Sequence, residues 1–329
     1  MGSSSYPLLF IFFLSLTISS DARLKVDYYA KTCPQFPQII REAVVAKQTV
    51  SPTTAAATLR VFFHDCMVNG CDASVLIAST RFNQAERDSE DNINLPGDAF
   101  DIVTRAKTHL ELTCPGVVSC ADVLAQTTRD LIKMVGGPFY EVRLGRKDSF
   151  VSNISHVHGN LPNGKMSMEE VIEVFKKKGF SIQEMVALIG SHTIGFSHCK
   201  EFASRIYTYN STNGVDPTLN LDYANGLKMF CANHQTNPSL AAFNDVVTPG
   251  TFDNMYYQNL KKGLGLLPID RMMHMDARTR PFAEKYAANQ TEFFAAFSRA
   301  IEKLSRLEVK VGNQGEVRHR CETFNTINV

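Results

Sequence analysis

The chain has 329 residues, of which 44% are hydrophobic and 20% are charged. This length allows about two domains, and the hydrophobic fraction suffices for a large core. The formal net charge is +1, and no long run of like charge occurs, so the composition gives no electrostatic case for nucleic acid or a membrane surface as a partner.

Residues 6–18 form a short apolar run that is followed by small and polar residues. This run is too short to span a bilayer comfortably and is typical of a secretory signal, although no basic residue precedes it. Ser20 and Ala22 are small residues at the positions expected before a cleavage site. We therefore predict a signal peptide over residues 1–22, with a buried core helix as the alternative.

The cysteines and the glycosylation motifs agree with export. Eight cysteines are an even number, which fits an oxidising compartment, and their spacing alone leaves the pairing open. Three asparagines stand in Asn-x-Ser/Thr motifs, namely Asn153, Asn210 and Asn289. We expect a secreted protein, in the extracellular space or the cell wall rather than the vacuole.

Two helices are predicted after the signal. Residues 37–48 carry apolar side chains at helical spacing, and Ser51 followed by Pro52 is typical of a helix start. The second helix then continues over residues 53–67 without a breaker.

Arg60 and His64 lie four residues apart on this second helix, so both side chains project from one face. A base that titrates near neutrality can take a proton from a bound hydroperoxide and return it to the departing oxygen. A fixed cation stabilises the negative charge that develops as the O–O bond breaks. The alternative is a buried histidine beside an arginine in a surface ion pair.

An oxygen-rich loop follows this helix. It contains Asp65, Asp72 and Ser74, a tight turn at Asn69 and Gly70, and Cys66 and Cys71, which could close it. These are hard ligands suited to calcium, although the sequence is not the EF-hand pattern. The polar segment over residues 79–96 comes next and contains Glu86 and Asn92, which on sequence alone are loop residues.

Helical patterns resume over residues 99–112 and 120–135. Residues 148–165, rich in Ser, Asn, His, Gly and Pro, form the best candidate for a connection between domains. Alternate histidines at His156 and His158 could bind a metal, but no cysteine or acid stands nearby, which favours ordinary surface residues.

The second half begins with two capping boxes, Ser167 with Glu170 and Ser181 with Glu184. The second of these predicted helices runs into the segment Gly-Ser-His-Thr-Ile-Gly around His192. Small residues beside a histidine at a helix end let a flat cofactor approach the backbone. His192 is thus a candidate axial ligand of haem iron, with a core or capping histidine as the alternative.

A second oxygen-rich loop covers residues 244–254 and includes Asp245, Thr248 and Asp253. Asp270 then stands in an apolar run, where an unpaired carboxylate would be costly to bury. It therefore needs a partner. From residue 279 the pattern predicts two more helices, and the second carries apolar residues at core spacing, namely Phe293, Phe294, Phe297, Ile301 and Leu304.

The segment from Leu59 to Ser74 resembles the distal haem segment of the class III secretory plant peroxidases, the horseradish peroxidase type. Leu-Ile-Gly-Ser-His-Thr-Ile-Gly, around His192, resembles their proximal segment, and the motifs that begin at Gly116 and Leu144 match as well. The resemblance covers essentially the whole mature chain. It implies a mainly α fold in which two helical domains enclose one haem b. The distal domain would be residues 23–165, completed by about 295–329, and the proximal domain residues 166–294.

The resemblance also implies roles for individual residues. Arg60 and His64 would be the distal pair, Asn92 would hold the tautomer of His64, and Phe63 would line the pocket. His192 would bind the iron, and Asp270 would accept the Nδ1 hydrogen of His192, which makes the imidazole more electron-donating. Pro162 would lie at the rim where aromatic donors dock.

Two calcium sites and four disulfides are implied in the same way. The first site would use Asp65, Val68, Gly70, Asp72 and Ser74 with help from Glu86, and the second Thr193, Asp245, Thr248, Thr251 and Asp253. The disulfides would be Cys33–Cys114, Cys66–Cys71, Cys120–Cys321 and Cys199–Cys231.

The chain departs from the family at two places. Tyr140 stands where members usually carry tryptophan, which this chain lacks, and Gly164 stands where better-known members have a second proline. The first departure removes a marker but no catalytic group. The second alters the predicted rim, so the sequence leaves the donor preference open.

The sequence thus predicts a secreted, monomeric haem peroxidase that reduces hydrogen peroxide and oxidises small phenolic donors by one-electron steps. Such an activity would serve lignification, suberisation, cell-wall cross-linking, oxidative stress or defence. The alternatives are a non-enzymatic calcium-binding protein on the same scaffold and a zinc hydrolase. No His-Glu-x-x-His or Cys-x-x-Cys ligand pair exists for the latter.

Overall fold

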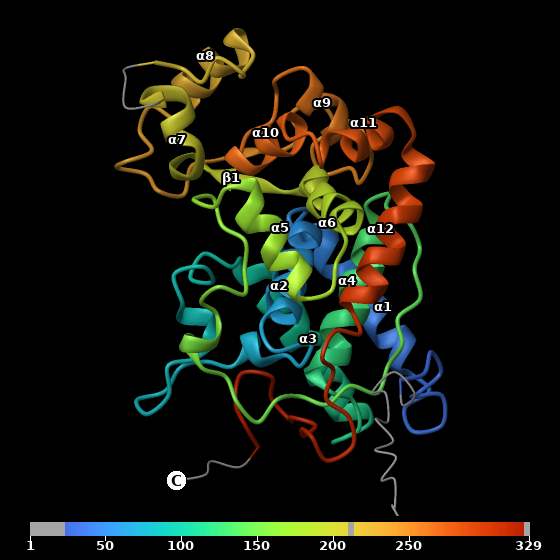
Figure 1. Ribbon diagram of the computed structural model, residues 1–329. Helices are drawn as coiled ribbons and strands as arrows, with labels where there is room; N and C mark the ends of the chain where they lie inside the picture. The colour runs from blue at the N-terminus through green and yellow to red at the C-terminus, as the bar shows by residue number, and fades with distance from the viewer. Residues whose placement is uncertain (1–23, 210–213, 326–329) are drawn as a thin grey trace, which may run out of the picture.

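The computed structural model describes residues 24–209 and 214–325 and is mainly helical, as the sequence predicts (Figure 1). The predicted signal peptide, residues 1–22, and the acceptor Asn210 lie outside the described residues. None of the helices in the described part of the chain has the length and apolar character that a membrane span requires.

The α-helices are α1 (Phe36–Val50), α2 (Thr54–Met67), α3 (Gly97–Thr113), α4 (Cys120–Met134), α5 (Met168–Lys177), α6 (Ile182–Ile189), α7 (Cys199–Tyr207), α8 (Leu221–Phe230), α9 (Met255–Lys261), α10 (Pro268–Met275), α11 (Arg280–Ala288) and α12 (Gln290–Leu304). Short 3₁₀ helices are η2 (Ser74–Leu76), η3 (Glu86–Asp88), η4 (Ile154–His156) and η5 (Gly190–Ile194). Two strands, β1 (Phe196–His198) and β2 (Ala241–Phe243), pair antiparallel.

Helix α2 lies at the centre of the N-terminal helices and packs against α3 and α4 (Figure 1). Its buried residues are mostly small or aliphatic, which lets the neighbouring helices approach closely. Helix α2 also contacts η5, the short helix that follows α6. The fold therefore brings together the two histidine-bearing segments.

The predicted extent of α2, residues 53–67, is confirmed to within one residue, but the predicted N-cap at Ser51 is wrong. The helix begins at Thr54, and the Ser51 hydroxyl caps nothing, because it donates to Asp98 Oδ2 at 2.7 Å. The Thr53 hydroxyl donates to the same oxygen at 3.1 Å. A long-range carboxylate thus outcompetes the local cap.

The two predicted capping boxes are confirmed. Ser167 and Ser181 each accept a hydrogen bond from the third residue of the following helix, and the side chains of Glu170 and Glu184 bond back to the cap amides. Helix α12 buries Phe293, Phe297, Ile301 and Leu304, while Phe294 is only partly buried.

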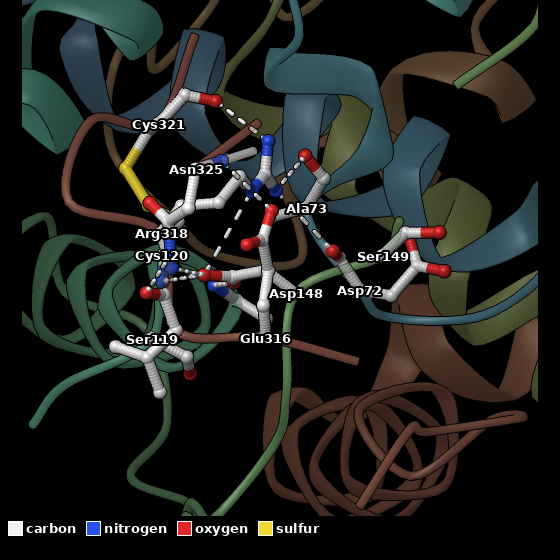
Figure 2. A network of polar contacts seen from close by, with 12 residues as sticks. Asp72, Ala73, Ser119, Cys120, Asp148, Ser149, Glu316, Arg318, Cys321 and Asn325 are labelled. Atoms are coloured by element: carbon white, nitrogen blue, oxygen red, sulfur yellow. Dashed lines mark hydrogen bonds and ion pairs between the residues drawn. A yellow bond between two sulfur atoms is a disulfide. The ribbon is translucent and has the colours of Figure 1, made fainter. Parts of the chain in front are cut away.

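The segment after α12 folds back onto the loop that follows α2. The buried guanidinium of Arg318 donates to the carbonyls of Ala73 at 2.6 Å and Cys321 at 2.7 Å (Figure 2). The Asp148 carboxylate accepts the amide hydrogens of Arg318 at 2.9 Å and Cys120 at 3.1 Å. These contacts tie the C-terminal segment to the oxygen-rich loop.

The structure contains the same four disulfides that the resemblance implies, namely Cys33–Cys114, Cys66–Cys71, Cys120–Cys321 and Cys199–Cys231. The first three lie among the N-terminal helices and the C-terminal segment, and the fourth joins the start of α7 to the end of α8.

Candidate active site

Arg60 and His64 project from one face of α2. The Nε atom of Arg60 donates to Nε2 of His64 at 3.4 Å, and Nη1 of Arg60 donates to the carbonyl of Asn94 at 3.3 Å. The helical spacing therefore places a guanidinium beside the imidazole, as the sequence predicts.

Asn92 fixes the tautomer of His64. The Asn92 amide nitrogen donates to the Glu86 carbonyl at 2.8 Å, so its Oδ1 atom faces His64 Nδ1, 2.7 Å away. Oδ1 is an acceptor, so the hydrogen of a neutral His64 ring lies on Nδ1. The unprotonated Nε2 atom accepts the long hydrogen bond from Nε of Arg60 and is the basic nitrogen of the ring.

His64 stays uncharged at neutral pH. Burial, assisted by the positive charge of Arg60, lowers the pKa of His64 to about 3. The neutral imidazole can therefore act as a proton acceptor over the whole physiological range.

His192 lies in η5, and its Nδ1 atom is 2.9 Å from Oδ1 of Asp270. Tyr256 donates its hydroxyl to the same oxygen at 2.6 Å, and the Leu267 amide donates to Oδ2 at 2.8 Å. Asp270 thus has the partners that its burial requires.

These contacts keep the Asp270 carboxylate ionised. Burial acts to raise its pKa, but the interaction with His192 and the hydrogen bonds from Tyr256 and the Leu267 amide together hold the pKa below its usual value. An ionised Asp270 accepts the Nδ1 hydrogen of His192. The Nε2 atom of His192 is then left free to bind a metal.

The first oxygen-rich loop is buried and rich in negative charge. Asp65, Asp72 and Glu86 are each almost completely buried, and the Ser74 hydroxyl donates to Glu86 Oε2 at 2.9 Å. The other carboxylate oxygen of Glu86 is buried without a hydrogen-bond partner. Burial, with a contribution from neighbouring carboxylates, raises the pKa of Asp65 to about 8 and that of Glu86 to about 9.

This loop has the donor set of a calcium site. Within the described ranges, no three His, Cys, Asp or Glu side chains form a group that could hold a metal alone. A cation here would also need hydroxyl and carbonyl oxygens, which calcium accepts readily. The φ angles of Asn69 (61°), Gly70 (101°) and Ala73 (59°) coil the backbone tightly. A Cβ at Gly70 would lie 2.4 Å from the carbonyl oxygen of Glu308, so this position needs glycine.

The second oxygen-rich loop converges beside His192. The Thr193 hydroxyl is 3.2 Å from the Thr251 carbonyl oxygen, and the Thr248 hydroxyl is 3.2 Å from Asp253 Oδ1. The same hydroxyl of Thr248 is 3.3 Å from Asp245 Oδ2. Burial, with the charge of Asp253, raises the pKa of Asp245. The structure thus brings the five predicted ligand residues together next to the candidate iron ligand.

Comparison with known proteins identifies the family. A family model described as "Peroxidase" matches residues 40–289. The chain is 59% identical to "Peroxidase 41" of Arabidopsis thaliana over 319 residues, which cover 97% of this chain and 96% of the relative. It is 56% identical to "Peroxidase 65" of the same plant, with 98% and 97% covered, and 54% identical to "Peroxidase 63", with 97% and 95% covered.

The chain belongs to the class III plant peroxidases. This peroxidase is a haem enzyme that reduces hydrogen peroxide and oxidises phenolic donors. The residues present fit a haem, because His192 has a free Nε2 atom and an ionised carboxylate behind it, while His64 presents a free base from α2.

The remaining residues discussed in the sequence analysis add little to the evidence for this peroxidase's active site. Pro162 lies partly exposed in the loop before α5, and its role stays a prediction. Phe63 packs its ring 5.8 Å from that of Phe175. Tyr140 is buried, and its hydroxyl has no hydrogen-bond partner. His156 bonds to the side chain of Asn69 at 2.9 Å.

Sequence reasoning missed two residues of this peroxidase that contact the site. Tyr256 holds Asp270, and Lys310 forms an ion pair with Asp72. Lys310 lies 238 residues from Asp72, and Tyr256 lies 14 residues from Asp270 in a different helix. Neither stands in a motif that predicts the contact. Only the fold brings them together.

Proposed function

We propose that His192 is the axial ligand of the haem iron and that His64, Arg60 and Asn92 form the distal site for peroxide. The observation that carries this proposal is the pair of oriented imidazoles. His64 is held by Asn92, and His192 by Asp270, with their free nitrogens available.

The haem, when bound, supplies the electrons that cleave the O–O bond. The Nε2 atom of His64 takes a proton from the peroxide and returns it to the departing oxygen, which leaves as the first water. The guanidinium of Arg60 stabilises the negative charge that develops on that oxygen. Each donor molecule then gives one electron and one proton, with Pro162 at the docking rim. The second water forms only after two donor molecules have supplied two electrons and two protons.

The two oxygen-rich loops each hold one calcium ion in this proposal. The side chains of Asp65, Asp72 and Ser74 with the carbonyls of Val68 and Gly70, assisted by Glu86, hold the first. Thr193, Asp245, Thr248, Asp253 and the Thr251 carbonyl hold the second. The buried, unpaired carboxylate oxygen of Glu86 supports the first site, and the convergence of hydroxyls and carboxylates beside His192 supports the second. Elemental analysis should find two calcium ions per haem, and a protein without calcium would contradict both sites.

We further propose a secreted monomer made of a distal domain over residues 23–165, completed by about 295–329, and a proximal domain over residues 166–294. It carries one haem b and has no membrane or nucleic-acid partner. Asn153 is partly exposed and Asn289 exposed, which suits glycosylation at both; Asn210 is the third acceptor.

The test compares two substitutions in the holoenzyme. His64→Ala should keep the haem but slow the reaction with peroxide about 100-fold or more, because a positioned acid-base group is lost. His192→Ala should instead weaken haem binding, because the iron loses its protein ligand. Rapid-mixing haem absorbance measures the first effect and haem content the second. A near-normal rate of reaction with peroxide in His64→Ala would overturn the distal assignment of His64. A native haem spectrum in His192→Ala would overturn the assignment of His192 as the axial ligand.

A further inference from the structure

Lys310 extends its ammonium group into the first oxygen-rich loop. The Nζ atom forms a salt bridge with Oδ2 of Asp72 and lies 3.3 Å from the carbonyl oxygen of Asn69. The Asp72 side chain is 1% exposed and that of Lys310 25%. A cationic side chain of the protein therefore already contacts the loop proposed to hold calcium.

The backbone holds Lys310 in this place. The Lys147 amide donates to the Lys310 carbonyl at 2.8 Å, and the Cys71 amide in the loop donates to the Leu307 carbonyl at 3.1 Å. The carbonyl of Glu308 covers Gly70 so closely that no side chain fits there. The segment that carries Lys310 is thus fastened to the loop just before this residue and to Lys147 at the residue itself.

The charges explain what the ammonium group does. Three buried carboxylates, those of Asp65, Asp72 and Glu86, lie around one loop. The positive charge of Lys310 acts on both Asp72 and Glu86 and opposes the effect of burial on each. The buried guanidinium of Arg318 hydrogen-bonds to the backbone carbonyls of Ala73 and Cys321 (Figure 2), and its charge acts on Asp65.

We propose that Lys310 is an internal competitor of calcium at this loop. Its ammonium group holds Asp72 when calcium is absent, and it lowers the affinity of the loop for calcium when the ion is present. The proposal rests on the calcium site of the proposed function. Both effects come from the positive charge of Lys310, which attracts the Asp72 carboxylate and repels a second cation at that carboxylate.

This arrangement makes Lys310 a positioning residue for the distal site. Asp65 follows His64 directly in α2, and its carboxylate accepts the Ala73 amide hydrogen at 3.0 Å. A loop that keeps a cation after calcium leaves should keep the end of α2 folded.

In the experiment, a chelator first removes calcium from the holoenzyme. The calcium-free protein is then titrated with calcium alone, and calorimetry measures binding. In K310M one of the two calcium affinities should rise by about tenfold, because a repelling charge is removed. The melting temperature of the calcium-free protein should fall, because Asp72 loses its partner. K310R keeps the charge and should restore an affinity close to that of the unmodified protein.

K303M is the matched control. Lys303 also bonds to a carboxylate and a backbone carbonyl, at 2.8 Å to Glu184 Oε2 and 2.7 Å to the Gly179 oxygen, but away from the loop. Its loss should lower stability and leave both calcium affinities unchanged.

The outcomes separate this proposal from the calcium site itself. Unchanged calcium affinities in K310M would overturn the role of Lys310 while the calcium site stands. If neither K310M nor the unmodified protein binds calcium at this loop, the site assignment fails, and the proposed role of Lys310 fails with it. If calcium-free K310M does not fold, the test is instead the rate at which a chelator removes calcium from calcium-bound K310M and from the calcium-bound unmodified protein. Release must then be slower in K310M than in the unmodified protein.

Discussion

Burial and the charge of Arg60 set the lowest pH at which His64 can still accept a proton, while the hydrogen bond to Asn92 acts to raise its pKa. His64 must be neutral to accept a proton, and its pKa of about 3 keeps it neutral at every moderately acid pH. The ordinary value is 6.5, so the unfolded chain takes up this proton first as the pH falls. The contribution of His64 to folding stability is therefore complete above about 6.5 and is lost between there and about 3.

Asn92→Asp should move this limit. A carboxylate beside Nδ1 favours the charged imidazole and raises the pKa of His64. The rate of the reaction with peroxide should then begin to fall at a higher pH than in the unmodified enzyme, as measured by rapid mixing across the acid range. Asn163→Asp, which adds the same charge in the loop before α5, is the control. If the two variants give identical acid profiles, Asn92 does not control the base.

Among individual residues, the sequence pattern predicts contacts within one helix but not contacts between different elements. Arg60 and His64 are neighbours because helical geometry makes them so. The pairing of His192 with Asp270 spans 78 residues and rests on family resemblance until the structure shows it. No sequence pattern predicts the hydrogen bond that the Tyr256 hydroxyl donates to Asp270.

At the scale of elements, the junction of α6 with η5, which leads to His192, is tightly packed at Gly190. A Cβ added at Gly190 would lie 2.0 Å from the Tyr257 hydroxyl oxygen and 2.7 Å from Phe293. That hydroxyl cannot move easily, since it donates to the Val186 carbonyl at 2.8 Å. Glycine is needed here for space and not for its backbone freedom.

Gly190→Ala should therefore destabilise the protein by about 1–3 kcal/mol and disturb the haem absorbance, because η5 carries His192. Gly226→Ala is the matched control. Gly226 lies within α8, has open space around its Cα and should gain about 0.5–1 kcal/mol from the better helix former. Denaturant unfolding measures both changes. Equal stabilities of the two variants would show that the junction can relax.

Helix patterns in the sequence predicted α1 to α6, α11 and α12, but they did not predict α7 to α10. The capping boxes of α5 and α6 are local, so four residues suffice to find each of them. The start of α2 depends on Asp98, which is far away in sequence and draws both Ser51 and Thr53 from a capping role.

At the scale of the whole molecule, the disulfides differ in what they contribute. Cys120–Cys321 closes a separation of 201 residues and Cys66–Cys71 one of 5. The loop-entropy model gives about 5 kcal/mol for the first and about 2 kcal/mol for the second. Replacing both cysteines of each pair by serine and comparing denaturant midpoints tests the order. A larger loss for the short pair would mean that native contacts, and not chain entropy, dominate.

The contacts of Lys310 and Arg318 with the first oxygen-rich loop also set an order of events during synthesis. Asp72 and Ala73 leave the ribosome long before their partners, because Lys310 comes 238 residues after Asp72 and Arg318 comes 245 residues after Ala73. Until those partners arrive, the loop beside His64 has neither its ammonium group nor its guanidinium. A nascent chain can thus form α1 to α4 early, yet it cannot finish its catalytic side until almost the entire polypeptide has been made. The loop beside His64 therefore lacks these two contacts until most of the chain has been translated.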